Sequence, residues 1–268
     1  MPRRARLDAE LVRRGLAKSR GHAAELIAAG RVTLRGTVAS KPATAVDTDA
    51  PVVVLADVDD PGYASRGAHK LVGALAEFGP AGLTVAGRRC LDAGASTGGF
   101  TDVLLREGAA QVVAADVGTG LLDWRLRTDE RVVVRDRTNV RHLTPDDIGG
   151  VVDVIVADLS FISLGLVLPA LVSCLAADGD LVPMVKPQFE VGKQRVGSGG
   201  VVRDPLVRAD AVLGVIASAA ELGLCANGVV ASPLPGPSGN VEFFVWLRRG
   251  PADDARDMVL AAVRGGPQ

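Results

Sequence analysis

Short apolar runs alternate with amphipathic stretches along most of the chain, and this pattern predicts a sheet of mostly parallel strands covered by helices. The amphipathic stretches have apolar residues at helical spacing, and the helix over 205–222 is the best marked, with Asp204 as its cap and Pro205 at its first position. The expected strands cover residues 88–93, 111–117, 131–136, 151–158, 180–186, 226–232 and 241–248. The sequence therefore predicts an α/β fold from about residue 66 onward.

The last two of these strands are expected to pair antiparallel. Only the short segment 233–240, rich in Pro and Gly, joins them, and it is too short for the crossover helix that a parallel pair needs. The fold class that we predict is therefore a seven-strand α/β sheet whose last strand is antiparallel.

The first 46 residues follow a different pattern, typical of a small α+β module. Leu7 and Leu11 begin a run at helical spacing that breaks at Gly15, and a second helical run ends at Gly30. Short strands are expected over 31–36 and 39–46, around a turn. The segment 57–62 has the Asp, Pro and Gly content of a domain boundary. We expect a first domain over 1–60, a linker over 61–66 and a second domain over 67–268.

Charge is distributed unevenly between these two parts. Residues 1–46 contain ten Arg or Lys and three acidic residues, whereas the whole chain has a formal net charge of -1. A basic module on an acidic body is typical of a polyanion-binding appendage, although a solvated basic helix face would carry the same charge. Ser19 adds a place at the start of the second helix, where exposed N–H groups could hold a phosphate. The candidate contacts in this module are Arg3, Arg4, Arg6, Arg13, Arg14, Lys18, Ser19, Arg20, Arg31, Arg35 and Lys41.

A long loop over 187–203 carries two more candidate contacts, Lys193 and Arg195, among four glycines. Its length favours a substrate-binding flap, and a plain surface loop is the alternative.

A glycine-containing stretch follows the first strand of the sheet and leads into a helix, which predicts a site for a nucleotide-like cofactor. Gly94 and Gly99 hold the outer positions of Gly-x-Gly-x-x-Gly, but Ser96 stands at the middle one. Asp116 ends the next strand, where an acidic residue can accept from ribose hydroxyls. An ordinary strand-to-helix turn would explain the glycines alone. The candidate contacts are Asp92, Gly94, Ala95, Ser96, Thr97, Gly98, Gly99, Phe100, Asp116 and Val117.

The predicted sheet with its antiparallel last strand resembles the class I, Rossmann-like fold of S-adenosylmethionine-dependent methyltransferases. Ser96 fits that class better than a dehydrogenase, since the methyltransferase loop holds an amino-acid moiety and no pyrophosphate. The resemblance implies that S-adenosylmethionine is the cofactor and that Asp116 binds its ribose. It also implies that Asp136, with Asn139 near it, lines the adenine, and that Asp158 lies in the same site.

Four charged residues lie at strand ends or on segments leading to them, where ligands of open α/β sheets bind. They are Lys70, Asp158, Lys186 and Glu242. Each alone could be a surface or capping residue. Methyl transfer to a ribose 2′-hydroxyl needs a base at the oxygen, and we expect Lys186 to be that base. Lys70 would favour its neutral form, while the two carboxylates would oppose it and would instead orient the amine.

This Lys, Asp, Lys, Glu order resembles the catalytic tetrad of the FtsJ-type ribose 2′-O-methyltransferases. About 45 residues at the N-terminus, among them Arg6-Leu7-Asp8 and Ser19-Arg20, resemble the alpha-L RNA-binding motif. With the segments 65–71, 92–100, 157–164, 185–190 and 236–242, nearly the whole chain resembles the hemolysin A/TlyA family. The resemblance implies 2′-O-methylation of cytidines in small-subunit and, because the N-terminal module is full, also large-subunit ribosomal RNA. Ribosomal RNA or ribosomal subunits are then the expected partners.

The composition and the motifs also bear on the protein's location and on three other functions that the chain could have. Three cysteines at unrelated spacings predict neither disulfides nor a metal site, and with no apparent signal peptide or membrane span we expect a cytoplasmic protein. An NAD-dependent oxidoreductase would share the fold and Asp116, but it leaves Lys186, Glu242 and the basic module unexplained. A noncatalytic RNA-binding protein stays open if the four charged residues do not meet. A membrane-lytic protein would need a membrane-spanning segment or an amphipathic segment of the membrane-binding kind, and the sequence shows no clear example of either.

Overall fold

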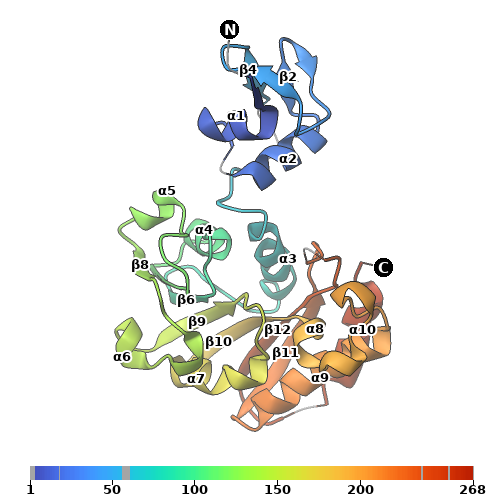
Figure 1. The fold of residues 1–268 in the computed structure, drawn as a ribbon. Helices are drawn as coiled ribbons and strands as arrows, with labels where there is room; N and C mark the ends of the chain where they lie inside the picture. The colour runs from blue at the N-terminus through green and yellow to red at the C-terminus, as the bar shows by residue number, and fades with distance from the viewer. Residues whose placement is uncertain (1–3, 18, 56–60, 237, 253, 268) are drawn as a thin grey trace. The chain divides into compact units, whose positions relative to one another are not determined.

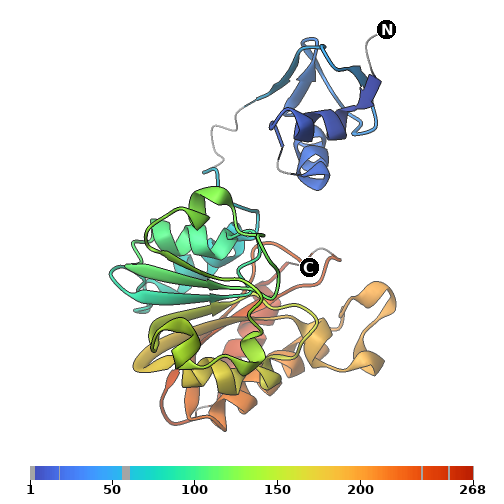
Figure 2. The same cartoon turned by 60° about the vertical axis from the view of Figure 1, so that its left-hand side comes forward.

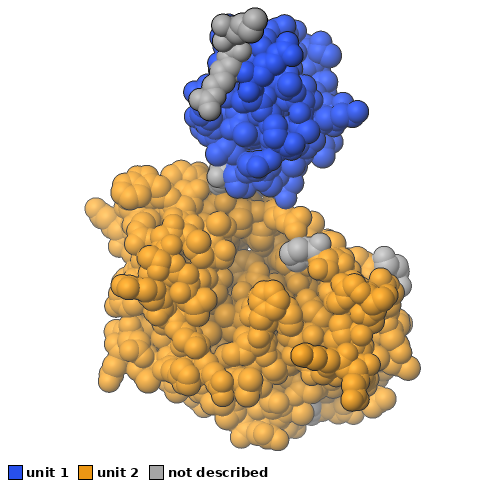
Figure 3. Space-filling model, viewed as in Figure 1, with its two compact units in different colours: residues 1–62 blue, residues 63–268 orange. Residues whose placement is uncertain are grey.

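The computed structural model describes residues 4–17, 19–55, 61–236, 238–252 and 254–267. They form two compact units, residues 1–62 and 63–268, which Figure 3 shows in different colours. Most of the segment 57–62, whose composition predicts a domain boundary, lies outside the described residues. Tyr63 and Ala64, which belong to the expected linker over 61–66, pack within the second unit. Within the described ranges, no helix has the length and apolar character that crossing a membrane requires.

Unit 2 is built on a seven-strand sheet with the order β11-β12-β10-β9-β6-β7-β8 (Figure 1). The strands are β6 (Arg89–Ala93), β7 (Gln111–Ala115), β8 (Val132–Arg135), β9 (Val152–Ala157), β10 (Leu175–Val185), β11 (Leu224–Ala231) and β12 (Phe243–Arg249). β12 runs antiparallel to both β10 and β11, and the other pairings are parallel. The predicted α/β class and the antiparallel last strand are confirmed. β10 begins earlier than expected, because Leu175 pairs with Val152 ahead of an irregularity that ends at Asp180.

Helices cover both faces of this sheet (Figures 1 and 2). The helices of unit 2 are α3 (Ala68–Phe78), α4 (Gly99–Arg106), α5 (Trp124–Arg127), α6 (Pro145–Ile148), α7 (Leu168–Ser173), α8 (Pro187–Glu190), α9 (Pro205–Ala220) and α10 (Arg256–Gly265). Neighbouring strand residues face opposite sides: Leu91 joins the core under α7, α9 and α10, and Cys90 joins the core under α3 and α4. The predicted helix over 205–222 is confirmed as α9, and Asp204 accepts from Leu206 N at 2.8 Å.

Unit 1 is a small α+β module. Its elements are β1 (Arg4–Arg6), α1 (Leu7–Arg13), α2 (Arg20–Ala28), β2 (Val32–Leu34), β3 (Thr37–Val38), β4 (Ala45–Asp47) and β5 (Val52–Val54). Leu7, Leu11, Ile27 and Val32 are buried in its core. The two helices are as predicted, but the strand expected over 39–46 is wrong, since only β4 forms there and it pairs with β1. Strands of two or three residues are too short to show a period in the sequence.

Candidate active site

The glycine-containing loop and the predicted catalytic residues follow neighbouring strands at one edge of the sheet. Ala93 of β6 pairs with Ala157 of β9, so Gly94 and Asp158 leave the sheet side by side. β6 and β9 are neighbours in the sheet. From β6 the chain continues to β7, away from β9, and from β9 it continues to β10, away from β6, so the direction of strand order reverses between them. Ligands of open α/β sheets bind at such a reversal. The strand order therefore reverses at the position where the sequence predicts the cofactor.

Backbone conformation in this loop demands glycine. Gly94 has φ +89, and a Cβ atom there would lie 2.6 Å from the carbonyl oxygen of Asp158. Ser96 also lies in the left-handed region, with φ +47, and its N–H donates to Asp116 Oδ2 at 2.9 Å. The other oxygen, Oδ1, accepts from Gly118 N at 2.7 Å. Asp116 thus fixes the loop against the end of β7 while it stays partly exposed.

Asp92 is the buried acid beneath this loop. Its Oδ2 accepts from Thr101 Oγ1 at 2.7 Å, while its Oδ1 is buried without a hydrogen-bond partner. Burial, aided by the negative charges of Asp158 and Asp116, raises the pKa of Asp92 to about 7. An unpaired buried acceptor costs free energy unless a donor reaches it.

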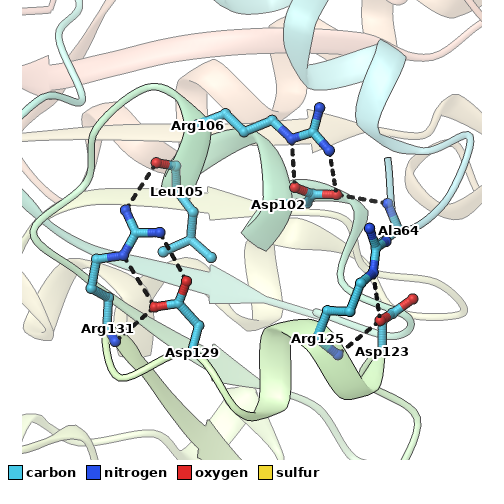
Figure 4. Close-up of polar contacts among 8 residues, drawn as sticks. All are labelled: Ala64, Asp102, Leu105, Arg106, Asp123, Arg125, Asp129 and Arg131. Carbon is cyan, nitrogen blue, oxygen red and sulfur yellow. Dashed lines mark hydrogen bonds and ion pairs between the residues drawn. The ribbon is translucent and has the colours of Figure 1, made fainter. Parts of the chain in front are cut away.

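The start of unit 2 packs against the beginning of α4. A Cβ atom at Gly99 would lie 2.4 Å from Ser65 Oγ, so the two segments touch. Ala64 N donates to Asp102 Oδ2 at 2.8 Å, and Arg106 Nε donates to the other oxygen at 2.7 Å, as Figure 4 shows. The guanidinium of Arg106 also lies over the Tyr63 ring, 4.4 Å from its centroid. These contacts hold residues 63–65 beside the loop that leads into α4.

The four predicted catalytic residues form two ion pairs. Lys186 Nζ lies 2.6 Å from Asp158 Oδ1 and donates to Ser160 Oγ at 3.0 Å. Lys70 Nζ, in the first turn of α3, lies 2.5 Å from Glu242 Oε2. Both lysines and Glu242 are buried, and Asp158 is partly exposed.

Strand register brings these two pairs to the same edge. Val185 of β10 pairs with Phe243 of β12, so Lys186, which follows Val185, and Glu242, which precedes Phe243, leave the sheet together. Pro183 pairs with Ala157 of β9, which places Asp158 next along the edge. Residues far apart in sequence therefore lie at the same edge of the sheet, beside the glycine-containing loop.

Two residues of the site escaped the sequence reasoning, Ser160 and Phe161. Ser160 contacts Lys186 directly. Phe161 has φ +63 and is 91% exposed, with its ring centroid 5.3 Å from that of Phe189. A signal existed, since both residues lie within three positions of Asp158. The positive φ and the exposure of Phe161, however, depend on the fold.

Asp136 and Asn139 lie in the segment after β8, and both hold local structure. Asp136 Oδ2 accepts from Gly120 N at 3.2 Å and from Arg127 Nη2 at 3.0 Å, and the guanidinium lowers the pKa of Asp136. Asn139 Oδ1 accepts from Arg141 N at 3.1 Å. Their contact with adenine stays a prediction, as does that of the exposed Val117.

The predicted RNA contacts in unit 1 are mostly arginines that share a few carboxylates. Asp8 contacts Arg6 and Arg20, Glu10 contacts Arg13 and Arg14, and Asp47 contacts Arg4 and Arg35. Elsewhere in unit 1, Arg31 donates to Leu55 O, Ser19 accepts from His22 N at the start of α2, and Lys41 is exposed. In unit 2, Lys193 lies in a short 3₁₀ helix, η3 (Lys193–Arg195). Arg195 of the same turn forms an ion pair with Asp210. Arg3 and Lys18 lie outside the described residues.

The described residues contain no group of three His, Cys, Asp or Glu side chains placed to hold a metal ion.

We expect Gly94→Ala to destabilise unit 2 and to abolish cofactor binding, because φ +89 and the Asp158 carbonyl both exclude a Cβ atom. The expected loss in the free energy of unfolding is more than about 1 kcal/mol. Gly214→Ala is the matched control, since it lies inside α9 with open space around its Cβ position and should gain about 0.5–1 kcal/mol. Urea unfolding and titration with S-adenosylmethionine measure both effects. Cofactor binding at the level of the unmodified protein would contradict this account of the loop.

Comparison with known proteins assigns both units. Residues 63–249 match the family model of FtsJ-like methyltransferases, and residues 5–52 match that of the S4 domain. The chain is 62% identical over 272 aligned residues to the 16S/23S rRNA (cytidine-2′-O)-methyltransferase TlyA of Mycobacterium tuberculosis, with all of both chains covered. It is 37% identical to Hemolysin A of Brachyspira hyodysenteriae, over 89% of this chain and 97% of that protein.

A solved structure of a hemolysin-like protein from Streptococcus thermophilus superposes with a TM-score of 0.78 at 37% identity, covering 98% of this chain and 95% of that one. The FtsJ-like match spans more than half of the chain, and the relatives match along nearly all of it. The chain belongs to the FtsJ-like methyltransferases and, within them, to the TlyA/hemolysin A family.

Proposed function

We propose that this methyltransferase moves a methyl group from S-adenosylmethionine to the 2′-hydroxyl of cytidines in ribosomal RNA of the small subunit and also of the large one. The observation that carries the proposal is the placement of two lysine–carboxylate pairs at the same edge of the sheet as the glycine-containing loop. The name of the Mycobacterium tuberculosis relative supplies the nucleoside and the two RNAs. A ribosomal RNA substrate implies the cytoplasm as the place of action.

The residues present fit the methyl donor. The loop 92–100 can approach a ligand closely, because it turns through glycines in the left-handed region. The buried, unpartnered Oδ1 of Asp92 can accept from an amino group, and the oxygens of Asp116 keep a lone pair each for ribose hydroxyls. When bound, S-adenosylmethionine supplies the electrophilic methyl group. Asp136, Asn139 and Val117 are the proposed adenine side of this site.

Lys186 is the proposed general base. Its Nζ is oriented by Asp158 and Ser160, and as a neutral amine, after one proton has left for solvent, it can accept the proton of a 2′-hydroxyl placed beside it. The Lys70–Glu242 pair lies at the same edge and gives a second fixed cation, which can donate to the substrate oxygen. Both pairs are largely out of water, where fixed charges act more strongly than in solvent.

RNA binding belongs to the S4 domain together with the surface around the site. The exposed arginines of unit 1 can contact phosphates, and the exposed Phe161 ring at the edge of the site can stack on a base. Lys193 and Arg195 are the proposed contacts of the loop that follows Lys186.

Incubation of purified ribosomal subunits with methyl-labelled S-adenosylmethionine tests this proposal. We expect label in dinucleotides that resist alkaline hydrolysis, since a methylated 2′-oxygen cannot attack the neighbouring phosphodiester bond. Mapping those dinucleotides identifies the nucleoside and the subunit. Label that stays on alkali-released mononucleotides would place the methyl group on a base and overturn the proposal, as would binding of subunits without any transfer.

A further inference from the structure

Two carboxylates are almost completely buried in unit 1, within the first 46 residues, where basic residues outnumber acidic ones. Asp8 is 4% exposed and Glu10 is 1% exposed, both on α1. A buried carboxylate is costly unless it is paired and hydrogen-bonded. Each of the two contacts a pair of arginines, so each forms an arginine–carboxylate–arginine cluster with a net charge of +1.

The Asp8 cluster joins three elements. Arg6, at the end of β1, donates from Nε at 3.1 Å and from Nη2 at 2.9 Å. Arg20, the first residue of α2, donates from Nη2 at 3.0 Å and from Nε at 3.3 Å, and Ala9 N donates at 2.8 Å. The two guanidinium groups hold the pKa of Asp8 far below its usual range, so it stays ionised.

The Glu10 cluster differs because one of its arginines, Arg14, also donates to backbone carbonyl oxygens of unit 1. Arg14 donates to Glu10 at 2.7 Å and also to the carbonyl oxygens of Ala50 and Thr48, at 2.7 and 3.0 Å. Its side chain is only 20% exposed, so this contact mainly ties α1 to the turn after β4.

In the Asp8 cluster both arginines face solvent. The side chains of Arg6 and Arg20 are 51% and 60% exposed. A guanidinium has five N–H donors, and each of these two uses two nitrogens on Asp8, which leaves further donors on each for an anion. Both contact the same oxygen, Oδ2, so Asp8 holds two cations side by side that would otherwise repel each other.

We propose that Asp8 is a positioning residue, which holds Arg6 and Arg20, two of the expected RNA contacts, together as one binding site for a backbone phosphate of RNA. The net charge of +1 is the charge that one phosphodiester neutralises. Fixed guanidinium forks suit phosphate oxygens, and little side-chain freedom is lost when the anion binds. This inference rests on the proposed RNA substrate and adds to it an acidic residue that favours binding of a polyanion.

Asp8→Asn tests this inference, because a role of Asp8 through charge alone and a role in positioning predict opposite changes in the affinity for RNA. Removing a negative charge should strengthen binding if the unit acts only through its total charge. Loss of positioning should weaken it, and we expect a Kd for ribosomal subunits about ten-fold higher, with a salt slope lower by about one. Filter binding of the full chain over a series of KCl concentrations measures both quantities.

Two further variants keep the result interpretable. Arg20→Lys keeps the charge on an exposed side chain but loses the fork, so it should fold and lower affinity in the same way. Glu25→Gln removes an exposed acid on α2 that, among the described residues, pairs with none of these arginines, and it should bind at least as tightly as the unmodified protein. Circular dichroism checks that each variant is folded.

The outcomes separate this inference from the proposed function. Asp8→Asn binding as tightly as the unmodified protein, with Arg20→Lys also unchanged, would overturn the phosphate site while RNA methylation stands. Failure of the unmodified chain to bind subunits would instead overturn the proposed function.

Discussion

Lys186→Met is expected to abolish methyl transfer while S-adenosylmethionine still binds. The Nζ atom of Lys186 is held by Asp158 at 2.6 Å and by Ser160 at 3.0 Å, at the edge where the cofactor loop leaves the sheet. General base catalysis contributes about 10²- to 10⁴-fold, and kcat should fall by that factor. Single-turnover transfer to ribosomal subunits and calorimetric titration with S-adenosylmethionine measure the two quantities separately.

Lys186→Arg distinguishes a role of Lys186 as general base from a role of its positive charge alone. Arginine keeps the ion pair with Asp158 but cannot lose its proton in a protein, so it should be nearly as inactive as methionine. Lys193→Met is the matched control, since that lysine lies in the exposed loop and should raise KM with little change in kcat. Activity in Lys186→Arg close to the normal level would show that the charge alone is needed, and loss of cofactor binding in Lys186→Met would make the residue structural.

Much of the fold follows from the sequence because the parallel strands are buried on both faces. Residues 154–157 form an unbroken apolar run between Asp153 and Asp158, and the structure has β9 there. Unit 1 was predicted less well. Its helices have a period that the sequence shows, whereas β1 and β5 have three residues each and depend on pairing with distant strands.

Some features of the candidate site can likewise be predicted from the sequence, and others depend on the folded structure. Asp158 and Lys186 are visible in the sequence because a charge directly after a buried strand must leave the core at the strand end. The pairing of each lysine with one particular carboxylate depends on strand register, which the sequence does not reveal. The burial of Asp8 and the unpartnered oxygen of Asp92 depend on packing and have no sequence signal.

Asp92→Asn is expected to remove a pH dependence from the stability of unit 2. The native pKa of about 7 lies above the ordinary value of 3.8, so between these values the folded protein holds a proton that the unfolded chain has released. Stability from this group is therefore complete below the unfolded pKa and is lost as pH rises through the folded one. Between pH 5 and pH 8 the free energy of unfolding of the unmodified protein should fall by about 3 kcal/mol relative to the variant.

Urea unfolding without cofactor at the two pH values measures this difference. Both tryptophans, Trp124 and Trp246, lie in unit 2, so their fluorescence reports on that unit alone. Thr101→Val supplies an opposite change, because the Thr101 hydroxyl favours the charged carboxylate and its loss should move the pH dependence to higher pH. Parallel pH profiles for Asp92→Asn and the unmodified protein would mean that Asp92 is ionised throughout. Its unpartnered oxygen would then be a buried charge that the bound cofactor has to neutralise.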